Sequence, residues 1–488
     1  MQEYDELVRL VKRAGVTSSI AELLSWDQQV MMPSGAKHVR AEQMGLIKSI
    51  QHELAVHPRI GELLTKIDRN NLNEEQQAQV HEIEWAYRRE IGIPTALAEE
   101  FAVLTASADS AWNEAKNGNN FLIFLPFLER IVEKQREIAH CMDPNREPYE
   151  VLMENFESGL SLASVNKFFG EIKSVTVPLV EAISKLPVPD TSILEIPIQK
   201  SLQMGYNTWF TRKLGYDLGK GRLDLSSHPM TIGFGRITTN LSSGWWNAIS
   251  STMHEKGHGD YEHNLPFEHF GTPLGTARSL GIHESQSRLW ENQVGKSLWF
   301  WEHNYDDLQS AYHHVLKNTD VTSFYRLINV VKPGFVRVDA DELTYILHIA
   351  LRFEIEQSLI SGDLAVKDVP EAWDVKMEEL LGIIPPTDTL GCLQDIHWSG
   401  GWLGYFPTYV VPGNMVAAQL FNMAAESIAP ELFGGNTKVL GEWLHQNIHR
   451  HGCRYGSLEL VRRATGKELG SEDYTRYLTA KFSELYKL

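Results

Sequence analysis

The sequence predicts a large, mainly α-helical single domain over residues 1–488, with one small strand element. Apolar residues recur every three or four positions through most of the first 185 residues and again from about Trp245 to the C-terminus, which is the period of an amphipathic helix. Apolar–polar alternation is confined to one short stretch, and no linker-like segment separates independent halves.

The predicted helices begin in the N-terminal part of the chain. The apolar positions of residues 44–54 fall on one helical face, and those of residues 80–87 do the same. Asn73 and Gln76 have the spacing of a capping box at the start of the second helix. Pro94 then predicts its end.

The middle of the chain breaks this pattern. Pro187, Pro189 and Pro197 indicate a loop or an extended crossing. Residues 230–234 alternate between apolar and small or polar side chains and predict a short strand. Helical patterns resume near Trp245, with Gly- and Pro-containing loops between them.

Composition and charge restrict the classes of partner. A hydrophobic share of 43% with a charged share of 22% is that of an ordinary globular protein. The 45 Lys and Arg residues stand against 63 Asp and Glu, a net charge of −18. Such a field repels phosphate backbones and anionic lipids, so we expect neither nucleic-acid nor membrane binding.

The chain has three scattered cysteines, Cys141, Cys392 and Cys453, none in a Cys-x-x-Cys pair. This usage is typical of a reducing compartment. We see no signal peptide after Met1 and no apolar run long enough to span a membrane, so we expect a cytoplasmic protein.

Residues 254–258, His-Glu-Lys-Gly-His, form a His-Glu-x-x-His motif. On a helix, His254 and His258 lie on one face and can reach one zinc ion. Glu255 lies beside them, where it can act as general base toward a water activated by the metal. The alternative is a helix that carries two unrelated histidines.

A catalytic zinc site usually needs a third protein ligand. Residues 281–292 read as a second helix after a loop rich in Gly and Pro, and Glu284 on it could face the first pair. His283 competes as the ligand, because periodicity does not separate the two, and Glu284 could instead be a solvated carboxylate.

Several further motifs make the chain resemble the carboxypeptidase Taq family of metallocarboxypeptidases. They are His283-Glu284-Ser285-Gln286, Val336-Arg337-Val338-Asp339-Ala340-Asp341, Gly391-Cys392-Leu393-Gln394-Asp395-Ile396-His397-Trp398, His228-Pro229-Met230, Trp26-Asp27-Gln28 and the Tyr405–Tyr409 segment. In this family the Glu of the His-Glu-Ser-Gln motif is the third zinc ligand, which the resemblance assigns to Glu284.

The resemblance covers essentially the whole chain. It implies a mostly helical fold with a deep active-site groove, similar to other gluzincin peptidases. It also implies a cytoplasmic homodimer that removes C-terminal residues from peptides with broad specificity. Zinc is the expected cofactor, and cobalt is an alternative for such a site.

The chain departs from the family pattern on one side of the motif. Phe234 stands at the Asp of the family's Asp-x-Arg-x-Thr motif, the loop from His228 to Arg236 is shorter than expected, and His-Pro-Phe has become His-Pro-Met. Asp260 replaces a residue that is usually apolar. These changes leave the predicted ligands and base intact.

A carboxypeptidase must recognise a free C-terminal carboxylate, which suits the planar fork of an arginine. By resemblance Arg337 is the first candidate, followed by Arg236 and Arg352, although each could form a structural ion pair. Tyr409 and His228 are candidates to stabilise the oxyanion.

Asp395 and His397 are candidates to orient ligands or shape the cleft. Two other functions stay open at this level: a catalytically weakened relative that binds peptides, and a metallo-endopeptidase on a similar scaffold.

Overall fold

Helices form most of the computed structural model, which describes residues 1–488 except for the side chain of Val410. The N-terminal half holds α1 (Gln2–Val30), α2 (Lys37–Ala55), α3 (Pro58–Lys66), α4 (Glu74–Gly92), α5 (Thr95–Gly118), α6 (Phe121–Met142), α7 (Pro148–Met153) and α8 (Leu162–Ser184). The rest holds α9 (Lys200–Lys213), α10 (Trp245–His263), α11 (Leu280–Arg288), α12 (Leu298–Ala311), α13 (His313–Leu316), α14 (Val321–Leu327), α15 (Glu342–Ser361), α16 (Val369–Leu381), α17 (Tyr405–Phe433), α18 (Lys438–Asn447), α19 (Ser457–Thr465) and α20 (Glu472–Tyr486). This confirms the mainly α-helical class. None of these helices has an apolar stretch long enough to cross a membrane, within the part of the chain that was described.

Local signals in the sequence set several helix boundaries. The Asn73 side chain accepts a hydrogen bond from the backbone amide of Gln76, and the Gln76 side chain accepts one from the backbone amide of Asn73, so the predicted capping box is present at the start of α4. The helix ends at Gly92, just before Pro94, as predicted.

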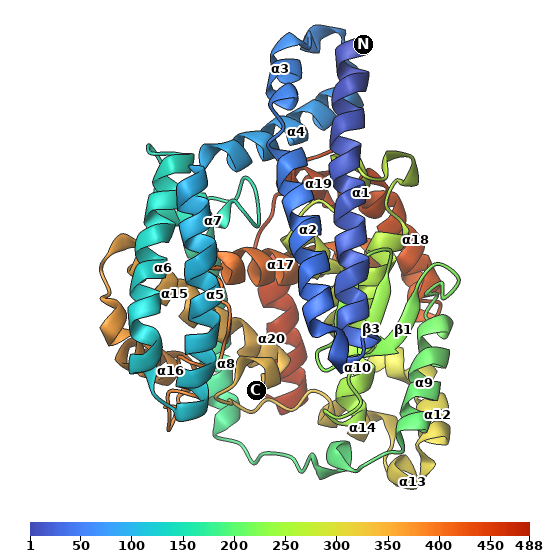
Figure 1. Cartoon of the computed structure of the whole chain (residues 1–488). Coiled ribbons are helices and arrows are strands. Elements are labelled where there is room, and N and C mark those ends of the chain that lie inside the picture. The colour runs from blue at the N-terminus through green and yellow to red at the C-terminus, as the bar shows by residue number, and fades with distance from the viewer.

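Two long antiparallel helices, α1 and α2, lie side by side across the front of the sheet in Figure 1. Trp26 fixes α1 to the sheet, because its ring is 7% exposed and lies under the guanidinium groups of Arg222 and Arg236. Asp27 pairs with Arg40 and thereby joins α1 to α2. The N-terminal hairpin therefore forms one wall beside the strands.

The sheet has three short strands, β1 (Arg222–Leu225), β2 (Thr231–Ile232) and β3 (Arg236–Thr239), in the order β1-β3-β2. β1 is parallel to β3, and β2 is antiparallel to it, with Thr231 opposite Ile237. The strand predicted within residues 230–234 is confirmed in β2. Its partners β1 and β3 were not predicted, because four residues with mixed polarity carry too little periodicity.

Two large hydrophobic clusters make up most of the core. One is built mainly from α5–α8, α15 and α16, and the other mainly from α9–α14, α18 and α19. α17 joins them, since Val411 and Met415 lie in the first cluster and Val416 and Leu420 in the second. α17 also packs against α11.

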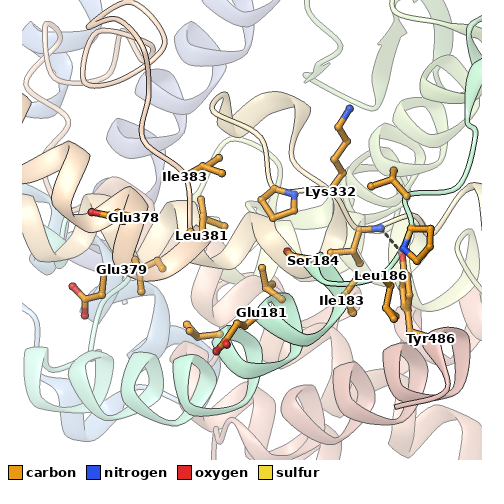
Figure 2. A pocket seen from close by; sticks show the side chains of 18 of the residues that line it. Glu181, Ile183, Ser184, Leu186, Lys332, Glu378, Glu379, Leu381, Ile383 and Tyr486 are labelled. Atoms are coloured by element: carbon orange, nitrogen blue, oxygen red, sulfur yellow. Dashed lines mark hydrogen bonds between the residues drawn. The ribbon is translucent and has the colours of Figure 1, made fainter.

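A pocket of about 460 Å³ lies between the C-terminal ends of α8 and α16 (Figure 2). Pro187 and Pro189 line it, as part of the crossing that the prolines predicted. Its walls are mostly apolar, and Tyr486 accepts a hydrogen bond from the backbone of Val331 at its edge (2.7 Å).

A buried carboxylate joins three parts of the core. Glu356 on α15 accepts hydrogen bonds from the Tyr149 hydroxyl, the Trp398 indole and the Gly404 amide, each at 2.8 Å. Gly404 directly precedes α17. Burial raises the pKa of Glu356 to about 7, although the three donors oppose this change.

This raised pKa predicts a pH-dependent stability. The folded protein holds the Glu356 proton up to about pH 7, whereas the unfolded chain releases it near 4.5. The free energy of unfolding therefore falls as the pH rises between these two pKa values, by about 3 kcal/mol in total. We expect the melting temperature of wild type relative to Glu356→Gln to fall from pH 5 to pH 8. A difference that is constant over this range would contradict the expectation.

Candidate metal centre and active site

The site is built where α10 and α11 approach each other closely. A Cβ at Gly257 would lie 2.4 Å from the backbone oxygen of Gln286 on α11. Only glycine permits this close approach of the two helices. The two helices thereby bring His254, His258 and Glu284 together.

The metal-ligating atoms of these three residues all lie within 4.8 Å of one another. The Oε2 atom of Glu284 is 3.6 Å from Nε2 of His254 and 3.3 Å from Nε2 of His258. Two ligands about 2.1 Å from a tetrahedral zinc are separated by roughly 3.4 Å. The donor set and its spacing therefore fit a zinc ion.

The hydrogen bonds behind the two histidines indicate which ring nitrogen is free. Nδ1 of His254 lies 2.9 Å from Glu291, and Nδ1 of His258 lies 2.5 Å from Nδ1 of His283. The other nitrogen of His283 lies 2.8 Å from Glu262. With neutral rings, each Nδ1 of the pair carries the proton and each Nε2 keeps its lone pair for a metal.

His283 was the competing ligand in the sequence. The structure places it behind His258, between that ring and Glu262, and outside the set of atoms that could hold a metal. Because neighbouring residues of a helix point about 100° apart, Glu284 reaches the Nε2 side of the pair, whereas His283 reaches Nδ1 of His258.

Glu284 is completely buried. It accepts hydrogen bonds from Arg288 (2.6 Å) and from the Ser287 hydroxyl (2.8 Å). Although burial raises its pKa, Arg288 and the two histidines hold the pKa of Glu284 well below its usual range. The side chain therefore stays ionised, as a metal ligand must.

The helix that carries Glu284 changes its geometry one turn later. After Arg288 it continues as a π-helix over Leu289–Val294, a local change that is frequent at functional sites. Glu291 lies in this segment and reaches His254. The sequence predicted one continuous helix over residues 281–292 and did not anticipate this contact.

Glu255 lies next to His254 on α10 and is 5% exposed. The hydroxyl of Thr231, on β2, donates to its Oε2 atom at 2.7 Å. Burial raises the pKa of Glu255, while His254 and Thr231 act in the opposite direction. A desolvated carboxylate that is held in one orientation is suited to accept a proton.

A cluster of two arginines lies around Asp395. One carboxylate oxygen accepts from Arg337 (2.7 and 3.1 Å), and the other accepts from Arg352 (2.6 Å). Gln394 binds the backbone amide of Arg337 and the guanidinium of Arg352, each at 2.8 Å. Asp395 therefore belongs to the arginine cluster and orients it, and its predicted role, to orient ligands or shape the cleft, stays a prediction.

The three candidate arginines differ in exposure. The Arg352 side chain is 1% exposed and paired on both sides, which favours a structural role. Arg337 is 12% exposed, and its remaining Nη1 lies 3.3 Å from the Tyr345 hydroxyl. Arg236 donates to the backbone of Gly233 and lies over Trp26. Arg337 is thus the more exposed of the two arginines that share the Asp395 carboxylate.

The remaining candidates lie around the metal ligands. Burial and the neighbouring Glu284 carboxylate raise the pKa of Tyr409, so its hydroxyl stays a donor. Desolvation and the charges of Arg337 and His254 lower the pKa of His228. His397 stacks on Tyr405 (5.3 Å) and contributes to the aromatic wall.

Two of the four departures from the family pattern have local consequences. Asp260 pairs with Lys256 at 2.5 Å, and the buried ammonium of Lys256 also lies 3.2 Å from the Trp290 ring centre. Asp260 thus neutralises a buried cation. Phe234 adopts a positive φ of 51° between two glycines and packs on Phe270, at 5.1 Å between ring centres.

Three residues of the site were missed by reasoning from the sequence. Thr231 was placed only in a strand, and neither Arg288 nor Glu291 was singled out. Arg288 and Glu291 lie on the same helical face as Glu284, at i+4 and i+7, so helical spacing alone could have indicated them. Nothing in the sequence indicates that β2 passes beside Glu255.

Comparison with known proteins gives consistent matches over the full chain. The model of the family described as carboxypeptidase Taq (M32) metallopeptidase matches residues 6–482. The chain is 37% identical to thermostable carboxypeptidase 1 of Thermus thermophilus, over 99% of both chains. It is 36% identical to carboxypeptidase 1 of Bacillus subtilis, over 99% of this chain and 98% of the relative.

A solved structure agrees with these matches. The M32 carboxypeptidase of Deinococcus radiodurans superposes with a TM-score of 0.96 at 34% identity, and the match covers all of both chains (100%).

Proposed function

Because the chain belongs to the carboxypeptidase Taq (M32) family of metallopeptidases, we propose that zinc held by His254, His258 and Glu284 serves its metal-dependent carboxypeptidase activity. The observation that carries the proposal is the group of three ligating atoms within 4.8 Å. Their His-His-Glu chemistry suits zinc, and cobalt is the alternative metal. Held by these three residues, the ion would supply the Lewis acidity that the hydrolysis of a peptide bond needs.

We assign proton transfer and oxyanion stabilisation to side chains of the protein. Glu255 takes a proton from the attacking water and passes it to the leaving amine. Thr231 keeps the Glu255 carboxylate in place. Tyr409 donates a hydrogen bond to the oxygen that gains charge, with His228 as a second donor. These roles are supported by the burial of Glu255 and by the position of Tyr409 beside Glu284.

The substrate would be a peptide with a free C-terminal carboxylate. We assign the binding of this carboxylate to Arg337. Two arginines around one Asp395 leave a net positive charge, and Tyr345 is within reach of the same guanidinium. Arg236 is the second candidate, because it is half-buried and lies in the sheet beside the site.

Replacing this anchor tests the assignment. We expect Arg337→Ala to lower kcat/KM for N-blocked peptides by about 100-fold, since a charge-assisted pair contributes roughly 2–3 kcal/mol. Arg236→Ala is the matched control and should have a smaller effect. Initial rates with both variants give the comparison, and an unchanged kcat/KM in Arg337→Ala would refute the anchor.

The resemblance also supports a homodimer in the cytoplasm. The three cysteines of the sequence are free in the structure, in keeping with a reducing compartment. Large apolar side chains are exposed along α1 and α2, among them Ile20, Leu23 and Leu46, which would suit a subunit contact.

A further inference from the structure

A cavity of about 220 Å³ opens beside the metal centre. It lies between α1, the β2 strand and the ends of α10 and α11, and it is lined by Glu22, Ser25, Thr231, Ile232, Gly233, Glu262 and His283. Two of these residues also touch the site: Thr231 holds Glu255, and His283 contacts His258. The cavity therefore shares its walls with the catalytic centre.

We propose that this cavity is the subsite for the penultimate residue of the peptide, and that it selects a cationic side chain there, lysine or arginine. The inference rests on the proposed function, because it needs the C-terminal carboxylate to lie at Arg337. It assigns Glu22 and Glu262 as the residues that determine this specificity.

The position of the cavity follows from the order of residues along α10. Arg337 is linked to the His254 end through Tyr345, Arg288 and Glu291, which contact one another in that order, and Glu291 contacts His254. His283 and Glu262 lie instead toward His258, one turn and more further along the helix. A peptide anchored at Arg337 passes the metal ligands with its scissile bond. The residue on the acyl side of that bond then reaches the end of α10 where the cavity lies.

The charges of the cavity favour a cation. Its lining contains two carboxylates and no lysine or arginine. Glu262 is bonded to His283, but Glu22 has no hydrogen bond or ion pair among the described residues. Both carboxylates line one cavity although Glu22 lies on an exposed part of α1, and desolvation and the charge of Glu262 raise the pKa of Glu22. An ammonium or guanidinium between them would relieve this repulsion.

The size of the cavity suits one side chain. Pockets for whole small molecules are roughly 300–1,000 Å³, so 220 Å³ is too small for such a ligand. Gly233 limits the space on one side, because a Cβ there would lie 2.9 Å from Oε2 of Glu22. With glycine at this position, the turn after β2 can lie in contact with the Glu22 carboxylate on α1.

The test uses N-acetylated tripeptides that end in leucine and differ only in the penultimate residue. Lysine is compared with norleucine, which has the same chain length without the charge, and with glutamate. Leucine release by the zinc-loaded full-length protein gives kcat/KM for each peptide. We expect lysine to be preferred over norleucine and glutamate to be the poorest.

The variants assign this preference to the cavity. Glu22→Gln should reduce the lysine-to-norleucine ratio about fivefold, the range of a partly exposed charge pair. Glu22→Lys should reverse the order and favour glutamate. Glu3→Gln is the matched control, because it removes the same charge from the same helix at roughly 28 Å along its axis, and it should keep the wild-type ratio.

The possible results separate two failures. A wild-type ratio of one, or a ratio that neither Glu22 variant changes, overturns the subsite while leaving the carboxypeptidase reaction intact. If no leucine is released from any peptide, the proposed function fails and the subsite fails with it. A reversed preference in Glu22→Lys supports both.

Discussion

Glu255→Gln should lower kcat by at least about 10³-fold while the protein keeps its metal. The amide has nearly the shape of the carboxylate and can still accept from Thr231, but it cannot take a proton from water. Because Glu255 is not a ligand, its loss leaves His254, His258 and Glu284 in place. The measurement is kcat on an N-blocked peptide, together with the zinc content of the same preparation.

Glu302→Gln is a suitable control for this prediction. It makes the same change in charge at an exposed position of α12, and its turnover should match wild type. If Glu255→Gln kept more than a tenth of the wild-type kcat at full metal occupancy, Glu255 would not be the general base.

Glu284→Gln should remove most of the metal affinity and lower turnover at limiting zinc by about 10³-fold. The substitution replaces the only carboxylate among the three ligands and leaves Arg288 without its buried partner. We therefore also expect a loss of stability of about 3 kcal/mol or more. Zinc titration by competition with a chelator, with the melting temperature recorded alongside, separates these two effects.

Glu291→Gln provides the comparison for the metal site. Glu291 touches His254 from behind but is not a ligand, so its loss should weaken metal binding by only about 10- to 100-fold. The order of the two variants is the informative result. Equal metal affinity in both, or near wild-type affinity in Glu284→Gln, would contradict the ligand assignment.

The grouping of the three candidate ligands could largely be predicted from the sequence, because two of them are encoded by local spacing. His254 and His258 stand at i and i+4, where any helix places two side chains on one face. The choice between His283 and Glu284 was different, since it depends on how α11 is rotated against α10. The contact at Gly257 decides that rotation, and periodicity does not contain it.

The substrate side was less predictable for the same reason. Arg337 and Asp395 are 58 positions apart, and their pairing follows from tertiary packing. Asp395 was predicted to orient ligands or shape the cleft, and in the structure its carboxylate pairs with both Arg337 and Arg352. Glu22 could not be predicted as a site residue, because nothing in the sequence around it distinguishes it from other exposed carboxylates. Its place beside the site follows only from the packing of α1 against the sheet.

The small sheet shows the same limit in the fold. β2 was recognisable from alternation, but β1 and β3 became visible only through their pairing. The long helices could be predicted because their amphipathic period extends over many turns. Thus the helical fold class could be predicted from the sequence, whereas the sheet that places Thr231 beside Glu255 could not.

The most direct test of the central claim is product analysis with one peptide in two forms. The zinc-loaded protein is given an N-acetylated peptide with a free C-terminal carboxylate and the same peptide as its C-terminal amide, and the products are identified by mass spectrometry. A carboxypeptidase anchored at Arg337 should release the last residue from the free acid and leave the amide intact. Cleavage of the amide at a comparable rate, or cleavage at an internal bond, would contradict it.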